Sequence, residues 1–256
     1  MEDFLIFTAV GFCAQLIDGA LGMAYGLTAT TAWLTLDVPP AHASAATHAA
    51  EIFTTAASAG SHLKNKNVDW PLFWKLTPAG MAGGVIGAYV LTGINGKALT
   101  PYIFAYLGLM GIFILYRSFK PVQADGLPKA AVAPLGAVGG FVDAVGDGGW
   151  GPVVTTTLVG AGEQPRYVIG TVNTAEFFVT VATSVGFLTA LLTGRWEEAG
   201  DITKHASAVA GLVVGGILAA PLAGYAVRQI SQHRLGRIVG ILVLGLSAYQ
   251  IARVMY

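Results

Sequence analysis

Charged residues are scarce in this chain. Lys and Arg number 14 among 256 residues, Asp and Glu also number 14, and together they make up 11% of the chain. A water-soluble domain has about a quarter of its residues charged. Apolar residue types make up 54%, and the mean hydropathy is +0.65. A chain with so few charges cannot cover its surface with hydrated groups, so we expect an integral membrane protein embedded in the lipid bilayer. The net charge of zero, without a basic stripe, excludes nucleic acid as a partner.

Cysteine is nearly absent as well. Cys13 is the single cysteine, which excludes a disulfide framework and a zinc site built from several thiolates. The N-terminus, Met1-Glu2-Asp3, is acidic where a secretory signal peptide would be basic, so we expect the first apolar run to be part of the mature protein. The loops between apolar runs are too short to fold alone. We therefore expect no soluble catalytic domain, no catalytic residues, no cofactor and no resident metal.

The apolar runs fall into two length classes. A helix that crosses the bilayer core needs ~20 residues. Runs of about that length cover residues 41–61, 71–92, 98–116, 166–192, 206–227 and 235–254. The runs 4–36 and 130–161 are too long for one crossing and too short for two, and glycines interrupt both. Glycine and proline weaken a helix interior, so each long run is expected to break into two half-helices.

The two interrupted runs align when the sequence is shifted by 125 positions. The shift pairs Asp18 with Asp143 and Glu51 with Glu176, which are rare acids within apolar runs, and it gives 11 identities across positions 11–60. The sequence thus predicts an all-α polytopic membrane protein made of two homologous four-segment repeats. The first repeat is residues 1–120, with the broken segment 4–36 and the spans 41–61, 71–92 and 98–116. The second is residues 130–256, with the broken segment 130–161 and the spans 166–192, 206–227 and 235–254.

The distribution of Lys and Arg favours an inverted arrangement of the two repeats. If both broken segments enter the membrane and return to the side they left, the basic residues divide 10 to 4 between the two sides. If all eight segments cross once, they divide 9 to 5. Cytoplasmic loops carry an excess of Lys and Arg, so we expect re-entrant broken segments. Inverted repeats with discontinuous helices are typical of transporters.

Ionisable residues inside the apolar runs are the most informative feature. Each costs ~2.5–3.5 kcal/mol or more on insertion scales, and such residues usually mark a transport pathway or a proton relay. Asp18 and Asp143 stand directly before the breaks, and capping of the following half-helix is an alternative role for them. The full set is Asp18, His48, Glu51, Asp143, Asp147 and Glu176.

A polar stripe runs along the second segment of each predicted repeat. In the first, it comprises Ser44, His48, Glu51, Thr55, Ser58 and His62, whose spacings of three and four residues place them on one helix face. In the second, it comprises Asn173, Glu176, Thr180 and Thr183. Such a face must contact protein or water, so we expect it to line a site. Hydrogen bonding between helices is the alternative.

Glycine-rich helix breaks suit an anion. They expose backbone N–H groups at the positive end of a helix dipole, and a small oxyanion accepts hydrogen bonds from N–H and O–H groups together. The predicted substrate-binding residues are Gly22, Tyr25, Gly26, Thr28, Thr30, Thr31, Gly148, Gly149, Trp150, Gly151, Thr155, Thr156 and Asn173. Ionised carboxylates would repel the anion, and burial disfavours their charged form. We therefore expect Glu51 and Glu176 to be protonated when the anion is bound. The candidates for proton coupling are Glu51, Glu176, Asp18, Asp143 and His48.

The residues of both breaks resemble the TauE/SafE sulfite-exporter family of the TSUP superfamily. In the second half, the matching stretches are Gly146-Asp-Gly-Gly-Trp-Gly-Pro152 and Gly170-Thr-Val-Asn-Thr-Ala-Glu-Phe-Phe178. In the first half, they are Leu16-Ile-Asp-Gly-Ala-Leu-Gly-Met-Ala-Tyr-Gly26 and His42-Ala-Ser-Ala-Ala-Thr-His-Ala-Ala-Glu51. The resemblance implies transport of sulfite, a sulfonate or a related organosulfur anion across a prokaryotic inner membrane. Asp147 departs from the pattern by interrupting the family's usual glycine triplet.

Other functions are weighed against anion transport. A divalent-metal transporter that uses His48 and the intramembrane carboxylates is the alternative, although these acids are spread over four runs. An intramembrane hydrolase is disfavoured, because no serine near His48 lies in a Gly-x-Ser-x-Gly setting. A membrane scaffold would not need symmetric buried acids. The sequence leaves open a channel, the direction of transport and the presence of a homo-oligomer.

Overall fold

The computed structural model of the protein describes residues 2–21, 23–119, 126–196 and 205–229, together with scattered positions between 234 and 252. The described residues are helical and contain no strand, which confirms the all-α expectation. The elements are α1 (Glu2–Leu21), α2 (Tyr25–Thr35), α3 (Pro40–Lys64), α4 (Trp70–Thr92), α5 (Gly96–Arg117), η1 (Lys129–Ala131), α6 (Val132–Gly146), η2 (Trp150–Thr155), α7 (Thr156–Gly160), α8 (Pro165–Leu192) and α9 (Ala206–Gln229). The predicted span 235–254 lies largely outside the described residues.

Local sequence signals mark where several helices begin. Pro40 and Pro165 occupy the first turns of α3 and α8, where proline costs no hydrogen bond because that N–H has no intrahelical acceptor. Asp69 caps α4 by accepting a hydrogen bond from the Leu72 N–H. Asn95 caps α5 in the same way at Ala98. These side chains satisfy backbone donors that the first helical turn leaves open.

Both long apolar runs are interrupted at their glycines, as predicted. The first interruption separates α1 from α2, and the second separates α6 from η2, a π-helical turn that continues into α7. The segments before the breaks are longer than half-helices. α1 has 20 residues, which at ~1.5 Å per residue is the thickness of a bilayer core. The re-entrant path remains a prediction.

Three helices in the described part of the chain are long and apolar enough to cross a membrane, by length and composition. They are Ala98–Tyr116, Lys129–Gly146 and Pro165–Leu192. The first and third match predicted spans, and the second is the portion of the broken segment 130–161 that precedes its break. α3 and α4 have 25 and 23 residues and so also reach crossing length. The polar stripe of α3 makes that helix less apolar.

Helix boundaries in the two halves share the shift of 125 positions. α2 begins at Tyr25 and η2 at Trp150, while α3 begins at Pro40 and α8 at Pro165. The contacts between helices also pair equivalent segments of the two halves. α1 packs along α9, α4 packs along α6, and α3 contacts α8. The first helix of each half therefore lies against the helix of the third segment of the other half, counting the broken segment as the first. This agrees with a duplication, and the repeat itself stays a prediction.

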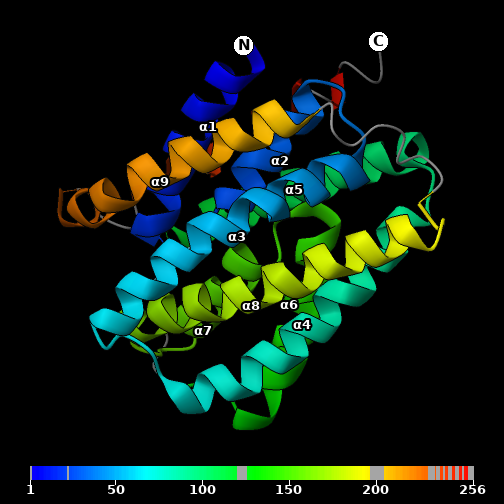
Figure 1. Ribbon diagram of the computed structural model, residues 1–256. Helices are drawn as coiled ribbons and strands as arrows, with labels where there is room; N and C mark the ends of the chain where they lie inside the picture. The colour runs from blue at the N-terminus through cyan, green and yellow to red at the C-terminus, as the bar shows by residue number, and fades with distance from the viewer. Residues whose placement is uncertain are drawn as a thin grey trace.

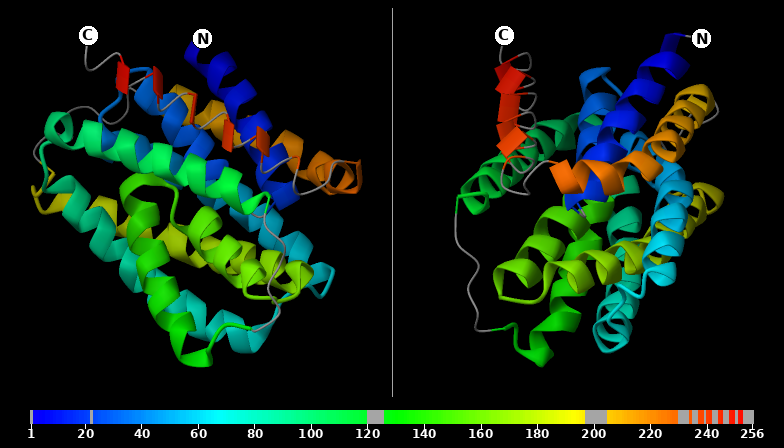
Figure 2. Two further views of the ribbon diagram at one scale, coloured as in Figure 1. Left: turned by 180° about the vertical axis from the view of Figure 1, so that it is seen from behind. Right: turned by 90° about the vertical axis from the view of Figure 1, so that its left-hand side faces the viewer.

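The helices form successive layers that enclose the two breaks. Figure 1 shows α1 and α9 on one side, α4 and α6 on the other, and α3 and α8 between them. α5 lies on the face that the left view of Figure 2 turns toward the reader, where it contacts α3 and α6. This arrangement brings α2, η2 and the middle of α3 into the interior of the molecule.

Small residues allow the outer helix pairs to approach closely. A Cβ atom added at Gly83 of α4 would overlap the carbonyl oxygen of Ala137 in α6. Gly11 of α1 similarly faces the Leu212 carbonyl of α9, and Gly136, its counterpart at the shift of 125, faces the Leu76 carbonyl of α4. Such contacts between backbones are how membrane helices associate without a hydrophobic driving force.

Candidate functional site

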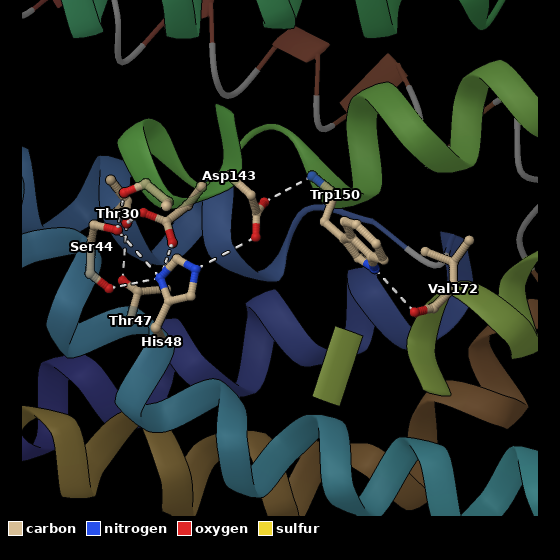
Figure 3. Close-up of polar contacts among 9 residues, drawn as sticks. Thr30, Ser44, Thr47, His48, Asp143, Trp150 and Val172 are labelled. Carbon is tan, nitrogen blue, oxygen red and sulfur yellow. Dashed lines mark hydrogen bonds and ion pairs between the residues drawn. The ribbon is translucent and has the colours of Figure 1, made fainter. Parts of the chain in front are cut away.

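His48 lies at the centre of a buried polar cluster in the middle of α3. Its side chain is 0% exposed. The Nδ1 atom lies 2.9 Å from the carbonyl oxygen of Ser44, one helical turn earlier, and 3.1 Å from Oδ1 of Asp147. The Nε2 atom lies 3.5 Å from Oδ2 of Asp143 (Figure 3). Because the nearest groups to Nδ1 are acceptors, this nitrogen carries a proton and donates.

Asp147 enters this cluster from the second break. Its backbone φ of 53° places it in the left-handed region, directly after the last residue of α6. The Oδ2 atom accepts a short hydrogen bond from the hydroxyl of Thr30 in α2. Thr30 in turn shares a hydrogen bond of 3.0 Å with the hydroxyl of Thr47 in α3 (Figure 3). The Asp147 carboxylate therefore connects three segments that are distant in the sequence.

Asp143 and Asp18 have a capping role at the two breaks. Oδ1 of Asp143 accepts a hydrogen bond of 2.8 Å from the backbone N–H of Trp150, the first residue of η2. The carboxylate of Asp18 is hydrogen-bonded by the backbone N–H of Tyr25, the first residue of α2. The two acids thus satisfy equivalent backbone donors, which is the alternative that the sequence left open for them. Asp143 has a second contact, with His48.

The paired glutamates are buried beside the cluster. Glu51 is 3% exposed and Glu176 is 8% exposed. Oε1 of Glu51 lies so near Gly26 that a Cβ atom there would approach it to 2.8 Å. Oε2 of Glu51 has no hydrogen-bond partner in the part of the chain that the structure describes. Glu176 of α8 lies close enough to Glu51 and Asp18 for their charges to interact.

The polar stripes face protein, as expected. In α3, Ser44, His48, Glu51 and Thr55 are buried, and in α8 Asn173, Glu176, Thr180 and Thr183 are buried. The stripe residues also connect the two helices, since the Ser58 hydroxyl donates a hydrogen bond of 3.1 Å to Oδ1 of Asn173. Hydrogen bonding between helices therefore accounts for one part of the stripe, and the His48 cluster accounts for another.

The two breaks meet each other. Gly151, at the start of η2, packs against Met23 and Ala24 of the first break, so that a Cβ atom would approach the Met23 Cα to 2.6 Å. Gly148 faces the hydroxyl of Tyr106 in α5. Gly149 packs on the backbone of α6. These glycines are therefore required by close packing in the conformation described. Gly22 lies outside the described residues.

The predicted threonines differ in their environments. The hydroxyls of Thr31 and Thr156 donate to carbonyls of their own helical segments, at Leu27 and Pro152. The hydroxyl of Thr28 is buried without a hydrogen-bond partner among the described residues. The Thr30 hydroxyl reaches a charged group of the other half, the carboxylate of Asp147. Among the predicted aromatic residues, Tyr25 donates to the Leu212 carbonyl and Trp150 to the Val172 carbonyl.

Several residues of the cluster were not predicted as site residues. Asp147 was noted as a buried acid, but its partners His48 and Thr30 lie 99 and 117 positions away in the sequence. Thr47 and Tyr106 carry no pattern that marks them, because Tyr106 belongs to a helix without a polar stripe. Ser44 belongs to the predicted stripe, and its hydroxyl donates to the Ala144 carbonyl at 2.7 Å.

An apolar cavity of about 580 Å³ lies between α3, α8 and α9. The cavity is lined in part by the rings of His42, Trp196 and His205. The ring centroids of His42 and Trp196 are 4.8 Å apart. Phe187 of α8 lines this cavity, and its ring centroid lies 6.1 Å from that of His48. Phe187 is 3% exposed. Its ring therefore stands between the apolar cavity and the polar cluster.

One potential cation site is present in the described residues. His48, Glu51 and Asp147 each offer a ligand atom, and these atoms lie within 4.8 Å of one another. The dispersion of the acids along the sequence had disfavoured a metal-ion site. The fold nevertheless brings His48 and two of these acids together. The ring nitrogens of His48 are engaged with Ser44, Asp143 and Asp147 in the conformation described.

The geometry defines a class of protein: a multi-pass α-helical membrane protein in which two discontinuous helices cross around a buried polar centre. Comparison with known proteins also indicates a membrane protein. The family model for the sulfite exporter TauE/SafE matches residues 7–250. The chain is 40% identical over 255 residues to a protein of Bacillus subtilis (strain 168) described as "Probable membrane transporter protein YtnM", covering 97% of this chain and 82% of that protein. No solved structure matches.

The chain belongs to the TauE/SafE family. It is a membrane transporter and not an enzyme, as the residues of the two breaks had indicated. Neither comparison supports a metal ion as the transported species.

Proposed function

We propose that this transporter moves a small sulfur-containing oxyanion, such as sulfite or a sulfonate, which binds where the two broken segments cross. The observation that carries the proposal is the crossing itself. It brings the Thr30 hydroxyl and the imidazole of His48 to Asp147 of the second break, which itself packs against Gly26 of α2, in the interior of the helix bundle. Hydroxyl, imidazole and backbone N–H donors together suit the several acceptor oxygens of such an anion.

The family name supports the substrate class. A match to sulfite exporters over nearly the whole chain makes a sulfur oxyanion the first ligand to test. The binding residues of the proposal are those predicted from the sequence, with Gly26, Thr30, Gly148 and Gly151 nearest to the crossing and Asn173 beside the α3–α8 contact. The membrane is a prokaryotic inner membrane, in keeping with the Bacillus relative.

Proton coupling is the second part of the proposal. Glu51 and Glu176 come from equivalent positions of the two halves and lie within electrostatic reach of each other, of Asp18 and of Asp143. An anion placed among these groups is repelled by each ionised carboxylate. Protonation of the glutamates would remove that repulsion, so the anion and protons would bind together. His48, in contact with Asp143 and Asp147, provides a route for protons between the acids.

The test is substrate flux into liposomes that contain the purified protein. Sulfite, thiosulfate, sulfate and ethanesulfonate are compared with chloride and with divalent metal ions at matched ionic strength. Selective flux of one sulfur oxyanion is the expected result. Flux of a metal ion alone, or equal flux of every anion, would contradict the proposal. Thermal unfolding in detergent provides an independent readout, because a ligand at 100 times its Kd stabilises the folded state by ~2.7 kcal/mol.

A further inference from the structure

We propose that the carboxylate of Asp147 occupies the oxyanion site as a built-in ligand, and that the transported anion binds by displacing it. The inference rests on the proposed function and identifies the atoms of the site. Asp147 is 3% exposed, and its two carboxylate oxygens lie against two different groups. Oδ2 accepts from the Thr30 hydroxyl, and Oδ1 lies 3.1 Å from Nδ1 of His48.

The groups around this carboxylate are those that an oxyanion needs. The Thr30 hydroxyl donates to Oδ2, and the Thr47 hydroxyl lies 3.0 Å from the Thr30 hydroxyl. The His48 ring lies against Oδ1, although its Nδ1–H is hydrogen-bonded to the Ser44 carbonyl at 2.9 Å, so Oδ1 has no hydrogen-bond partner among the described residues. Thr30, Thr47 and His48 belong to α2 and α3, so they form one wall that does not depend on the second break. A carboxylate and a sulfur oxyanion present the same feature to this wall, namely a delocalised negative charge on adjacent acceptor oxygens. These side chains can bind either group, but in the conformation described the Asp147 carboxylate already occupies the position.

The backbone conformation at position 147 does not require an aspartate. The left-handed φ of 53° is a conformation that glycine adopts without strain. At the shift of 125, the position equivalent to Asp147 is Gly22, although the neighbouring Asp18 and Gly26 are matched by Asp143 and Gly151. The second break therefore carries a carboxylate where the first has no side chain. The other acid of the same break, Asp143, has the structural task of capping Trp150.

Displacement requires a side-chain movement and not a change of fold. The backbone of Asp147 is held by a hydrogen bond of 2.6 Å from its N–H to the Asp143 carbonyl. Two side-chain torsions connect this backbone to the carboxylate, so in the proposed exchange the carboxylate rotates about these torsions while α6 and η2 stay in place. The arriving anion would then take its place against Thr30 and His48. Competition by a tethered carboxylate lowers the apparent affinity for the anion.

The test compares Asp147→Gly with Asp37→Gly in the purified full-length protein. Asp37 is a matched control, because it is an aspartate with a φ of 60° in the exposed turn after α2. Thiosulfate, sulfite and sulfate binding is measured by calorimetry at one pH and ionic strength. Removing a competing charged hydrogen-bonding group should lower the Kd of the preferred anion by about tenfold or more in Asp147→Gly. In Asp37→Gly the Kd should stay within about twofold of the original.

Acetate provides a second readout that detects the emptied position directly. It is a free carboxylate with the shape of the deleted side chain. Acetate should raise the Tm of Asp147→Gly and leave the Tm of the original protein and of Asp37→Gly unchanged. Asp147→Asn keeps the size of the side chain without its charge, and it should bind the oxyanion with intermediate affinity. This variant keeps the test open should the glycine variant fail to fold.

The outcomes separate the inference from the proposed function. If the original protein binds a sulfur oxyanion and neither Asp147 variant binds it more tightly, the displacement model is wrong and the proposed substrate class stands. If Asp143→Asn tightens binding as much as Asp147→Asn, net charge is the cause and the built-in ligand is refuted. If neither the original protein nor any variant binds a sulfur oxyanion, both proposals fail.

Discussion

Neighbouring threonines of α2 show how much the direction of one hydroxyl matters. Thr30 and Thr31 are both buried, at 1% and 0% exposed. The Thr31 hydroxyl donates to the Leu27 carbonyl within its own helix. The Thr30 hydroxyl points across the crossing of the breaks to Asp147. At the scale of single residues, the site is therefore defined by which hydroxyls remain directed away from their own helix.

Thr30→Val should weaken oxyanion binding, whereas Thr31→Val should not. The change removes a hydroxyl donor and keeps the side-chain shape, and a hydrogen bond to a charged group contributes ~1.5–3 kcal/mol. In the Asp147→Gly background, where no carboxylate competes for the hydroxyl, we expect the Kd for the preferred anion to rise roughly tenfold or more in Thr30→Val. Calorimetric titration measures both variants. Equal weakening in the two would show that Thr30 acts through packing and not as a donor.

Contact between helix backbones dominates at the scale of elements. The approach of α4 to α6 leaves no room for a side chain at Gly83, where a Cβ atom would overlap the Ala137 carbonyl. The same holds at Gly140, which faces the Gly80 carbonyl. Gly60, on the exposed side of α3, has no other atom within 4 Å of its Cβ position. Helical glycines of this chain thus include both packing positions and open ones.

Gly83→Ala should destabilise the protein, and Gly60→Ala should not. Overpacking a tight contact costs ~1–3 kcal/mol, since backbones must separate. In the open position, alanine is favoured over glycine in a helix by ~0.5–1 kcal/mol. Thermal unfolding in one detergent compares the two variants with the original protein. A Tm for Gly83→Ala equal to or above the original would show that α4 and α6 are not closely packed in solution.

The two halves interlock at the scale of the whole molecule. Because α1 packs on α9 and α4 packs on α6, neither half can move as a rigid body without disturbing both outer pairs. The crossing of the breaks and the pair of buried glutamates lie between these outer pairs. Each half contributes one glutamate, so coupling of protons to transport is a property of the assembled molecule and not of either half.

A Glu51→Gln, Glu176→Gln double variant should show a weaker pH dependence of anion binding than the original protein. Protonated glutamates favour the bound anion, so affinity in the original protein should fall as pH rises through their titration. Glutamine stays neutral at every pH, so the part of the pH dependence that the two glutamates cause should be absent from the double variant. Anion titrations over a pH series in detergent measure this. Glu163→Gln, in the exposed turn after α7, is the matched control. An undiminished pH dependence in the double variant would exclude the glutamates as the coupling groups.

The positions of the helices could be predicted from the sequence, because local residue patterns determine where each helix begins and ends. The glycines at both breaks predicted the interruptions after Leu21 and after Gly146. The spacing of the polar residues predicted that His48 and Glu51 share one face of α3. The cluster of His48 with Asp147 and Thr30 was not predictable, since it depends on how three separate helices are packed.

Composition, periodicity and the paired acids by themselves determined a multi-pass α-helical membrane protein with two broken segments and an acidic centre, because these features depend on local backbone preferences and on the cost of charge in lipid. The tertiary structure decided which acids cap a helix, which hydroxyls face the centre and which carboxylate contacts His48. Those outcomes depend on how closely helix backbones approach at glycines such as Gly83 and Gly151. These are contacts between segments far apart in the chain, and no local sequence pattern predicts them.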